Sequence, residues 1–261
     1  MQVTSLHLLL VEPSSTQARI VEGWLRDFGI RHLQRVQSGE AALETMAGQP
    51  PDLVISAMHL PGMTGSDLAV QMREDDRFRD TAFILISSET GFRYLEPLRQ
   101  AGITAILPKP FDEPQLHTSL TAALHFLEPQ PLDEGRFVPE ELQVLLVDDL
   151  ATARRFMRQI LERMGIERID EAGNGVEARD LIDCNFYDLI ITDYHMPEMD
   201  GEALLNYIRN DSQQPSVPVL MVTSRAEGSR IAALQQAGVS AVFDKPFDVD
   251  SLRSMIESVL A

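Results

Sequence analysis

Five polar side chains in the second half of the chain stand at the ends of short apolar runs. They are Asp148, Asp149, Asp193, Thr223 and Lys245. Apolar runs that alternate with helical patterns are typical of parallel strands, whose carboxyl ends meet at one edge of a sheet. Each residue taken alone would be interpreted as a solvated loop residue. Together, the five are expected to converge on one rim and to form a site.

The residue types at this rim favour phosphoryl transfer. Three carboxylates gathered at one point repel each other and need a cation, and oxygen ligands of this kind suit Mg²⁺, which keeps several of its waters. A lysine beside them can pair with a carboxylate or neutralise a phosphoryl oxygen, and a threonine hydroxyl adds a donor. The combination suits transfer of a phosphoryl group to a carboxylate, where catalysis is mainly positioning and charge stabilisation.

The elements that must position these residues follow from hydrophobic spacing. Phe156, Ile160 and Met164 recur at helical spacing after the acidic pair, and Gly165 ends that helix. Further helical patterns separate the apolar runs, and a last helix is expected over about residues 248–260. This alternation predicts a doubly wound α/β fold. Its strands are expected near residues 144–147, 166–172, 187–192, 217–223 and 240–243.

The first half of the chain repeats the second at a constant shift of 136 positions (188 − 52). The segment Asp52 to Gly65 aligns with Asp188 to Gly201, and four other blocks align at the same shift. The chain therefore predicts two domains, residues 1–127 and 143–261. The join, residues 128–142, holds three prolines and five acids, and this composition predicts an exposed, fairly stiff linker.

The first copy lacks the acids of the second. Glu12, Pro13 and Ala57 occupy the positions of Asp148, Asp149 and Asp193. Lys109 persists where Lys245 stands, and we expect it to pair with Glu12 and preserve the fold; a ligand site there is the alternative. The other aligned positions have Ser87 for Thr223, Leu107 for Phe243, and Lys109–Pro110 for Lys245–Pro246.

One helix of the first copy carries large apolar side chains at helical spacing. Ile20, Trp24 and Phe28 share a face of this helix, and we expect them in the core.

Composition excludes several classes of protein. The net charge is −18, so the chain offers no basic footprint for a nucleic acid and should be repelled by an anionic membrane surface. Cys184 is the only cysteine, which rules out an intramolecular disulfide. The apolar runs are too short to span a bilayer, and no signal peptide precedes the first strand. A cytoplasmic location is expected.

The pattern formed by Asp148–Asp149, Asp193, Thr223 and Lys245–Pro246 resembles the receiver domain of bacterial two-component response regulators. The resemblance covers all of residues 143–261, and the first copy resembles a degenerate receiver, or pseudoreceiver. It implies two flavodoxin-like (βα)5 domains, each with a parallel five-stranded sheet in the order 2-1-3-4-5.

The resemblance also implies roles for the acids. Asp193 would be the phosphoacceptor, which takes a phosphoryl group from a histidine kinase or a phosphotransfer protein. Asp149 and Asp193 would bind Mg²⁺ directly, with the backbone carbonyl of His195, and Asp148 would act mostly through a metal-bound water. The chain would be a phosphoprotein with self-catalysed phosphorylation and dephosphorylation, and not an enzyme with a separate substrate.

Three further residues receive roles from the same resemblance. Lys245 would contact the acceptor carboxylate and the phosphoryl group, and Thr223 would bond a phosphoryl oxygen. Phe243 would be the aromatic switch that turns inward when Thr223 moves. The Lys245–Pro246 bond is expected to be cis.

The leading hypothesis is a tandem-receiver signalling protein. Phosphorylation of Asp193 would change contacts with a downstream protein, and the first copy would serve as a scaffold or dimerisation module in a possible homodimer. The alternative is the regulatory region of a larger enzyme, such as a nucleotide cyclase. A phosphatase that uses an aspartyl phosphate is disfavoured, because Tyr194 and His195 follow Asp193 and leave no DxD pattern.

Overall fold

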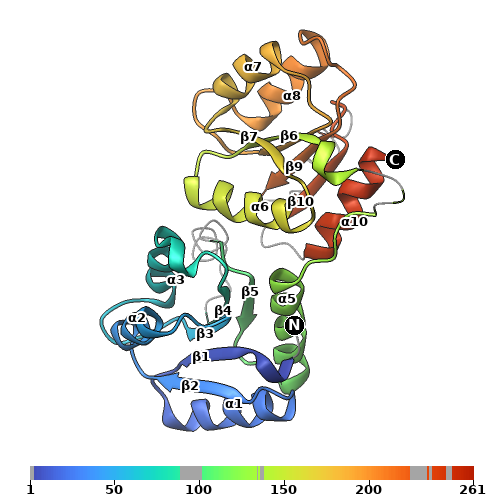
Figure 1. Ribbon diagram of the computed structural model, residues 1–261. Helices are drawn as coiled ribbons and strands as arrows, with labels where there is room; N and C mark the ends of the chain where they lie inside the picture. Colours follow the sequence, from blue (N-terminus) through green and yellow to red (C-terminus); the bar gives the residue numbers. More distant parts are fainter. Residues whose placement is uncertain are drawn as a thin grey trace. The chain divides into compact units, whose positions relative to one another are not determined.

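The computed structural model describes residues 3–88, 102–133, 135, 138–223, 234, 237–244 and 249–261. The chain divides into two compact units, Met1–Glu128 and Pro129–Ala261 (Figure 1). Each unit is a parallel five-stranded sheet with helices on its faces. None of the helices in the described part of the chain combines the length and apolar character needed to cross a bilayer.

The first unit follows the expected alternation. Its sheet has the order β2-β1-β3-β4-β5, and all neighbouring strands are parallel. The strands are β1 (His7–Val11), β2 (His32–Val36), β3 (Leu53–Ala57), β4 (Ala82–Ser87) and β5 (Ala105–Pro108). The helices are α1 (Ser15–Asp27), α2 (Gly39–Gly48), α3 (Gly65–Glu74) and α5 (Glu113–Leu127), and single 3-10 turns lie at Val3–Ser5 and Asp76–Phe78.

The second unit repeats this arrangement. Its sheet has the order β10-β9-β8-β6-β7, again parallel throughout, so both sheets have the expected 2-1-3-4-5 order. The strands are β6 (Gln143–Val147), β7 (Arg168–Ala172), β8 (Leu189–Asp193), β9 (Val219–Thr223) and β10 (Ala241–Asp244). The helices are α6 (Ala151–Arg163), α7 (Gly175–Cys184), α8 (Gly201–Asn210) and α10 (Val249–Leu260), after a 3-10 turn at Pro139–Glu141.

Burial on both faces explains the continuous apolar runs. Every residue of β3 and of β8 is buried, as parallel strands between two helical layers require. In the first unit, α2 and α3 pack on one face of the sheet around Met46, Leu68 and Phe83. Helices α1 and α5 lie together, and the rings of Phe28 and His117 are 4.9 Å apart (Figure 1).

The duplication extends to individual hydrogen bonds. The bounds of β3 and β8 differ by the same 136 positions as the sequence blocks (189 − 53). Asp52 accepts a hydrogen bond from the backbone N–H of His7 at 2.8 Å, and Asp188 accepts one from Gln143 at 2.8 Å. The two copies therefore use the same contact to fix the start of their first and third strands.

The expected core face of α1 was wrong. The buried face of α1 consists of Ala18, Val21 and Leu25, whereas Ile20 is 48% exposed and Trp24 and Phe28 are half-buried. The face of α1 that is buried against the sheet therefore lies about one residue along from the face that carries the largest side chains. The ring of Trp24 instead packs edge-on against the ring of Phe111, with the two centroids 6.0 Å apart.

The segment between the domains is exposed at most of its described residues, as its composition predicts, but two of them are buried. Leu132 is 1% exposed, and its N–H donates to the carbonyl oxygen of Met164 in the second unit. Pro139 is also buried, and a Cβ at Gly165 would lie 3.1 Å from it. Parts of this segment therefore belong to the core of the second unit.

We predict that a methyl group at either Gly65 or Gly201 destabilises its own unit. An added Cβ would lie 2.4 Å from the carbonyl oxygen of Ala57 or of Asp193, and backbone atoms cannot move aside cheaply. Gly65→Ala should lower the free energy of unfolding by about 1–3 kcal/mol. Urea denaturation, followed by the fluorescence of Trp24 for the first unit and by circular dichroism for both, measures the effect.

The control is Gly23→Ala on α1, where a Cβ would meet nothing within 4 Å. This change should stabilise the first unit by roughly 0.5–1 kcal/mol, because alanine loses less backbone entropy in a helix. Equal shifts for Gly65→Ala and Gly23→Ala would contradict the close-approach explanation.

Candidate functional site

The carboxyl ends of β6, β8 and β9 bring three of the expected residues to one edge of the second sheet. Val147 pairs with Thr192, so Asp148 and Asp193 come next on neighbouring strands. Asp193 pairs in turn with Val222, and Thr223 follows at the end of β9. Asp148 and Asp193 are each 6% exposed, and Thr223 is 3% exposed. This edge therefore places two largely buried carboxylates and a hydroxyl side by side.

Asp148 is held between β6 and the start of α6. Its backbone N–H donates to the carbonyl oxygen of Ala172 at 3.2 Å, and its Oδ1 accepts a hydrogen bond from the N–H of Leu150 at 2.9 Å. The carboxylate thus lies at the amino end of α6, where the helix dipole favours negative charge. Asp149, one residue later, is exposed.

Asp193 is fixed by the loop that follows it. Its Oδ2 accepts a hydrogen bond from the N–H of His195 at 2.8 Å, and the N–H of Gly201 donates to the carbonyl of Tyr194 at 2.9 Å. Glu198 in this loop has a φ of 64°, and the first unit has Gly62 at the same position with a φ of 81°. The loop therefore has a similar backbone conformation in both copies, although only the second copy has an aspartate, Asp193, at the end of the preceding strand.

The remaining expected residues are only partly described. Phe243 is half-buried in β10, next to Val222 of β9. Lys245 and Pro246 lie outside the described residues, so their roles and the expected cis bond stay predictions.

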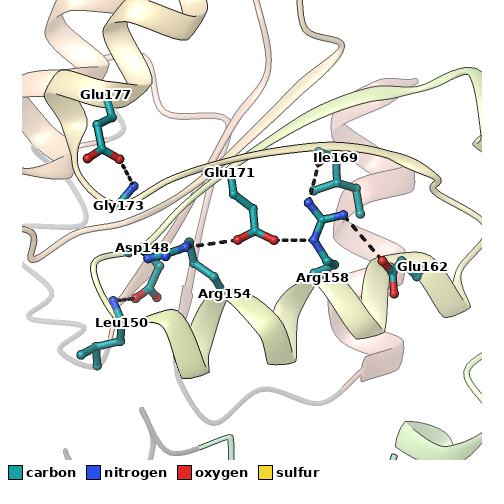
Figure 2. Close-up of polar contacts among 9 residues, drawn as sticks. All are labelled: Asp148, Leu150, Arg154, Arg158, Glu162, Ile169, Glu171, Gly173 and Glu177. Atoms are coloured by element: carbon teal, nitrogen blue, oxygen red, sulfur yellow. Dashed lines mark hydrogen bonds and ion pairs between the residues drawn. The ribbon is translucent and has the colours of Figure 1, made fainter. Parts of the chain in front are cut away.

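Two arginines on α6 form a polar network beside the acids (Figure 2). Arg154 donates through Nη1 to the carbonyl oxygen of Asp148 at 2.5 Å and through Nε to Glu171 at 3.3 Å. Arg158 also pairs with Glu171 and donates to the carbonyl oxygen of Ile169 at 2.6 Å. Of the two arginines, Arg154 is the one that contacts the strand end from which the acids project.

Sequence reasoning missed Arg154. The spacing of Arg154 and Arg158 at i and i+4 shows that they share a helix face, and Glu171 of β7 supplies a counter-charge. No sequence pattern shows that one guanidinium reaches a backbone carbonyl six residues earlier in the chain, because this contact depends on how α6 packs against the sheet.

The donor set at this edge fits a hard cation. No group of three or more His, Cys, Asp or Glu side chains is poised around a single metal position within the described ranges. Asp148 and Asp193 nevertheless supply two buried carboxylates on adjacent strand ends. Carboxylate oxygens completed by carbonyl oxygen and water are the ligands that Mg²⁺ prefers, so the residues present fit this ion.

The corresponding edge of the first unit has a different charge arrangement. Glu12 is 5% exposed; its Oε1 accepts from the N–H of Ser14 at 2.8 Å, and its Oε2 lies 3.8 Å from Nζ of Lys109. This confirms the expected pair. Ala57 and Ser87 are buried at the ends of β3 and β4. The Lys109–Pro110 peptide bond is cis.

The helix-to-strand ion pair is also rearranged between the copies. The first unit pairs Glu22 of α1 with Arg35 of β2 at 3.5 Å, whereas the second pairs Arg158 of α6 with Glu171 of β7. The charges are exchanged at equivalent positions. Ala18, which is buried, stands where the second unit has Arg154, so the first unit lacks the contact from this helix position to its strand end.

Comparisons with known proteins agree with this geometry. A family model described as the response regulator receiver domain matches residues 8–121 and again residues 144–257. The chemotaxis protein CheY-3 of Vibrio cholerae is 33% identical over 120 residues, which cover 46% of this chain and 92% of that protein. The chemotaxis protein CheY1 of Helicobacter pylori is 37% identical over 120 residues, covering 46% of this chain and 97% of that protein.

One solved structure is also similar to part of the chain. The receiver domain of the Francisella response regulator 1452 is 29% identical, covers 46% of this chain and 97% of its own, and superposes with a TM-score of 0.43. The two family matches coincide with the two sheets, and both sheets have the same strand order. The chain therefore belongs to the response regulator receiver family of two-component signalling, with two receiver domains in tandem.

Proposed function

We propose that the second domain receives a phosphoryl group on Asp193 from a histidine kinase or a phosphotransfer protein. The observation that carries this proposal is the pair of largely buried carboxylates, Asp148 and Asp193, at adjacent strand ends of a receiver domain. A pair of buried carboxylates without a cation lowers the stability of the fold. A site that binds a cation gains the positive charge needed to accept a phosphoryl group.

The chain's own residues would carry the reaction in distinct roles. An oxygen of Asp193 forms the new bond to phosphorus as the bond from phosphorus to the donor breaks. Thr223, buried at the end of β9, would donate its hydroxyl to a phosphoryl oxygen, and Lys245 would pair with another. Asp148, Asp149, Asp193 and the backbone carbonyl of His195 would hold Mg²⁺, which supplies positive charge against the phosphoryl oxygens.

The output would be an altered protein contact. A phosphoryl group on Asp193 would draw Thr223 toward it, and the half-buried Phe243 on the neighbouring strand would turn inward into the space released. The target is a downstream protein. A nucleic acid or an anionic membrane is disfavoured as a target, because the chain carries a net charge of −18. We expect these events in the cytoplasm of a bacterium.

We propose that the first domain is a pseudoreceiver that serves as a scaffold or dimerisation module. Ala57 has no oxygen to phosphorylate, Pro13 has no carboxylate, and Glu12 is already paired with Lys109. A complete core with no acceptor is suited to protein contact. A role as the regulatory region of a larger enzyme, such as a nucleotide cyclase, stays an alternative prediction, and the reading frame of the gene decides it.

Incubation with acetyl phosphate and Mg²⁺, followed by intact mass measurement, tests the acceptor. We predict one added phosphoryl group on the wild-type chain and none on Asp193→Asn. The matched control is Ala57→Asp in the Asp193→Asn background, which restores an aspartate to the first domain beside Pro13 and should still gain nothing. A phosphoryl group that persists in Asp193→Asn would refute the assignment.

Substitution of Arg154 tests the anchoring of the acids. Arg154→Ala removes the donor to the Asp148 carbonyl, so the strand end loosens and Mg²⁺ affinity should fall by about tenfold, as for groups that orient metal ligands. Arg158→Ala is the control. Arg158 and Arg154 both bond to Glu171, but the substitution of Arg158 leaves the hydrogen bond from Arg154 to the Asp148 carbonyl intact. Calorimetric titration measures both; equal affinities in the two variants would contradict this role.

A further inference from the structure

The first domain contains a pocket at the edge where the second domain has its acids. The pocket has a volume of about 420 Å³ and lies between α1 and the turn from β5 to α5. Its lining includes Glu12, Ile86 and Lys109 from the ends of strands, which we call the inner end, and Ile20, Trp24 and Phe111 from α1 and the turn before α5, which we call the outer part. Its size falls in the range of about 300–1,000 Å³ that is usual for small-molecule sites.

The outer part of the pocket is an apolar surface left in contact with solvent. Ile20 is 48% exposed, and Trp24 and Phe111 are half-buried. The two rings meet edge-on, with centroids 6.0 Å apart and planes at 69°, so they form a corner and do not cover each other's faces. A flat aromatic molecule placed in this corner would cover Ile20 and stack on a ring face, which is a favourable arrangement.

The inner end carries a cation whose nearest partner is neutral. Nζ of Lys109 donates to Oε1 of Gln17 at 2.8 Å and lies farther, 3.8 Å, from Glu12. Glu12 is held in place by the N–H of Ser14, whereas Gln17 is an exposed residue of α1 that can turn away. An anionic group that replaced the Gln17 amide oxygen would form a stronger, charge-assisted hydrogen bond with Lys109.

These features differ from those of the second domain at the same helix positions. Ile160 stands where the first domain has Trp24, and it is fully buried in the core. Ala153 stands where the first domain has Gln17. The helix of the first domain therefore contributes an aromatic and a polar side chain to the pocket, whereas the helix of the second domain has a core isoleucine and an alanine at these positions.

We propose that this pocket binds a small aromatic molecule with one anionic group, such as a carboxylate. The ring lies against Trp24 and Phe111, and the anion bonds to Lys109. The first domain would then respond to a metabolite at the edge where the second domain responds to a phosphoryl group. The proposal is independent of Asp193, because it uses residues of the first domain alone.

Trp24 is the only tryptophan of the chain, so it reports on this pocket directly. The probe is 8-anilinonaphthalene-1-sulfonate, an aromatic anion that accepts excitation energy from a nearby tryptophan. Bound probe should emit on excitation of Trp24. Added 1-naphthoate should displace it at concentrations about tenfold lower than the neutral isostere 1-naphthamide, because the acid gains the charged hydrogen bond to Lys109.

Matched variants separate the two parts of the pocket. Lys109→Met should remove the preference for the acid over the amide, and Lys109→Arg, which keeps the charge, should retain it. Ile20→Glu places a like charge in the outer wall and should weaken binding of the probe. Val70→Glu is its control, because Val70 is also an exposed apolar residue, 38% exposed on α3 and away from the pocket lining.

Three results would overturn the proposal. They are absence of energy transfer from Trp24 to the bound probe, equal displacement by the acid and the amide in the wild type, and equal probe affinity in Ile20→Glu and Val70→Glu. Circular dichroism verifies that each variant is folded. If Lys109→Met does not fold, Lys109→Arg and Ile20→Glu still decide between the outcomes.

Discussion

Repulsion between carboxylates at the ends of adjacent parallel strands is the constraint on which the second domain depends. Parallel pairing places Asp148 and Asp193 next to each other, and the covering loops leave each only 6% exposed. Two such charges in a poorly hydrated place destabilise the fold unless opposite charge or hydrogen-bond donors offset them. The N–H groups of Leu150 and His195 provide donors, and the close approach of α8 at Gly201 fixes the loop that carries one of them. We propose that a bound cation offsets the repulsion further, which would link the fold to phosphoryl chemistry.

The first domain has the same parallel pairing of strands, but it lacks a pair of carboxylates at the ends of those strands. At the three aligned positions the first domain has Glu12 as its single acid, and this carboxylate is partnered by Lys109 and the N–H of Ser14. On the neighbouring helix, α1 carries the half-buried Trp24 where α6 carries the core residue Ile160. The charges are exchanged between the Glu22–Arg35 and Arg158–Glu171 pairs: the contact between helix and strand is kept while its polarity is not.

Much of this organisation could be predicted from the sequence because it depends on local periodicity and on one repeat. The strands and the meeting of Asp148, Asp193 and Thr223 follow from apolar runs and the rules of parallel sheets, whereas the sheet order was expected from the resemblance to receiver domains. The rotation of α1 could not, because side-chain size does not show which of two adjacent stripes faces the sheet. Burial of Leu132 and the reach of Arg154 to a carbonyl were also missed, since both depend on tertiary packing rather than on spacing.

Calorimetric titration of the whole chain with Mg²⁺ tests the central claim, that the two copies differ in their demand for a cation. The account predicts one Mg²⁺ per chain, and loss of that binding when Asp148→Asn and Asp149→Asn are combined. Two bound ions per chain would show that the first domain kept a site that we regard as lost. Binding that survives in the doubly substituted chain would show that the acids at the end of β6 are not the ligands.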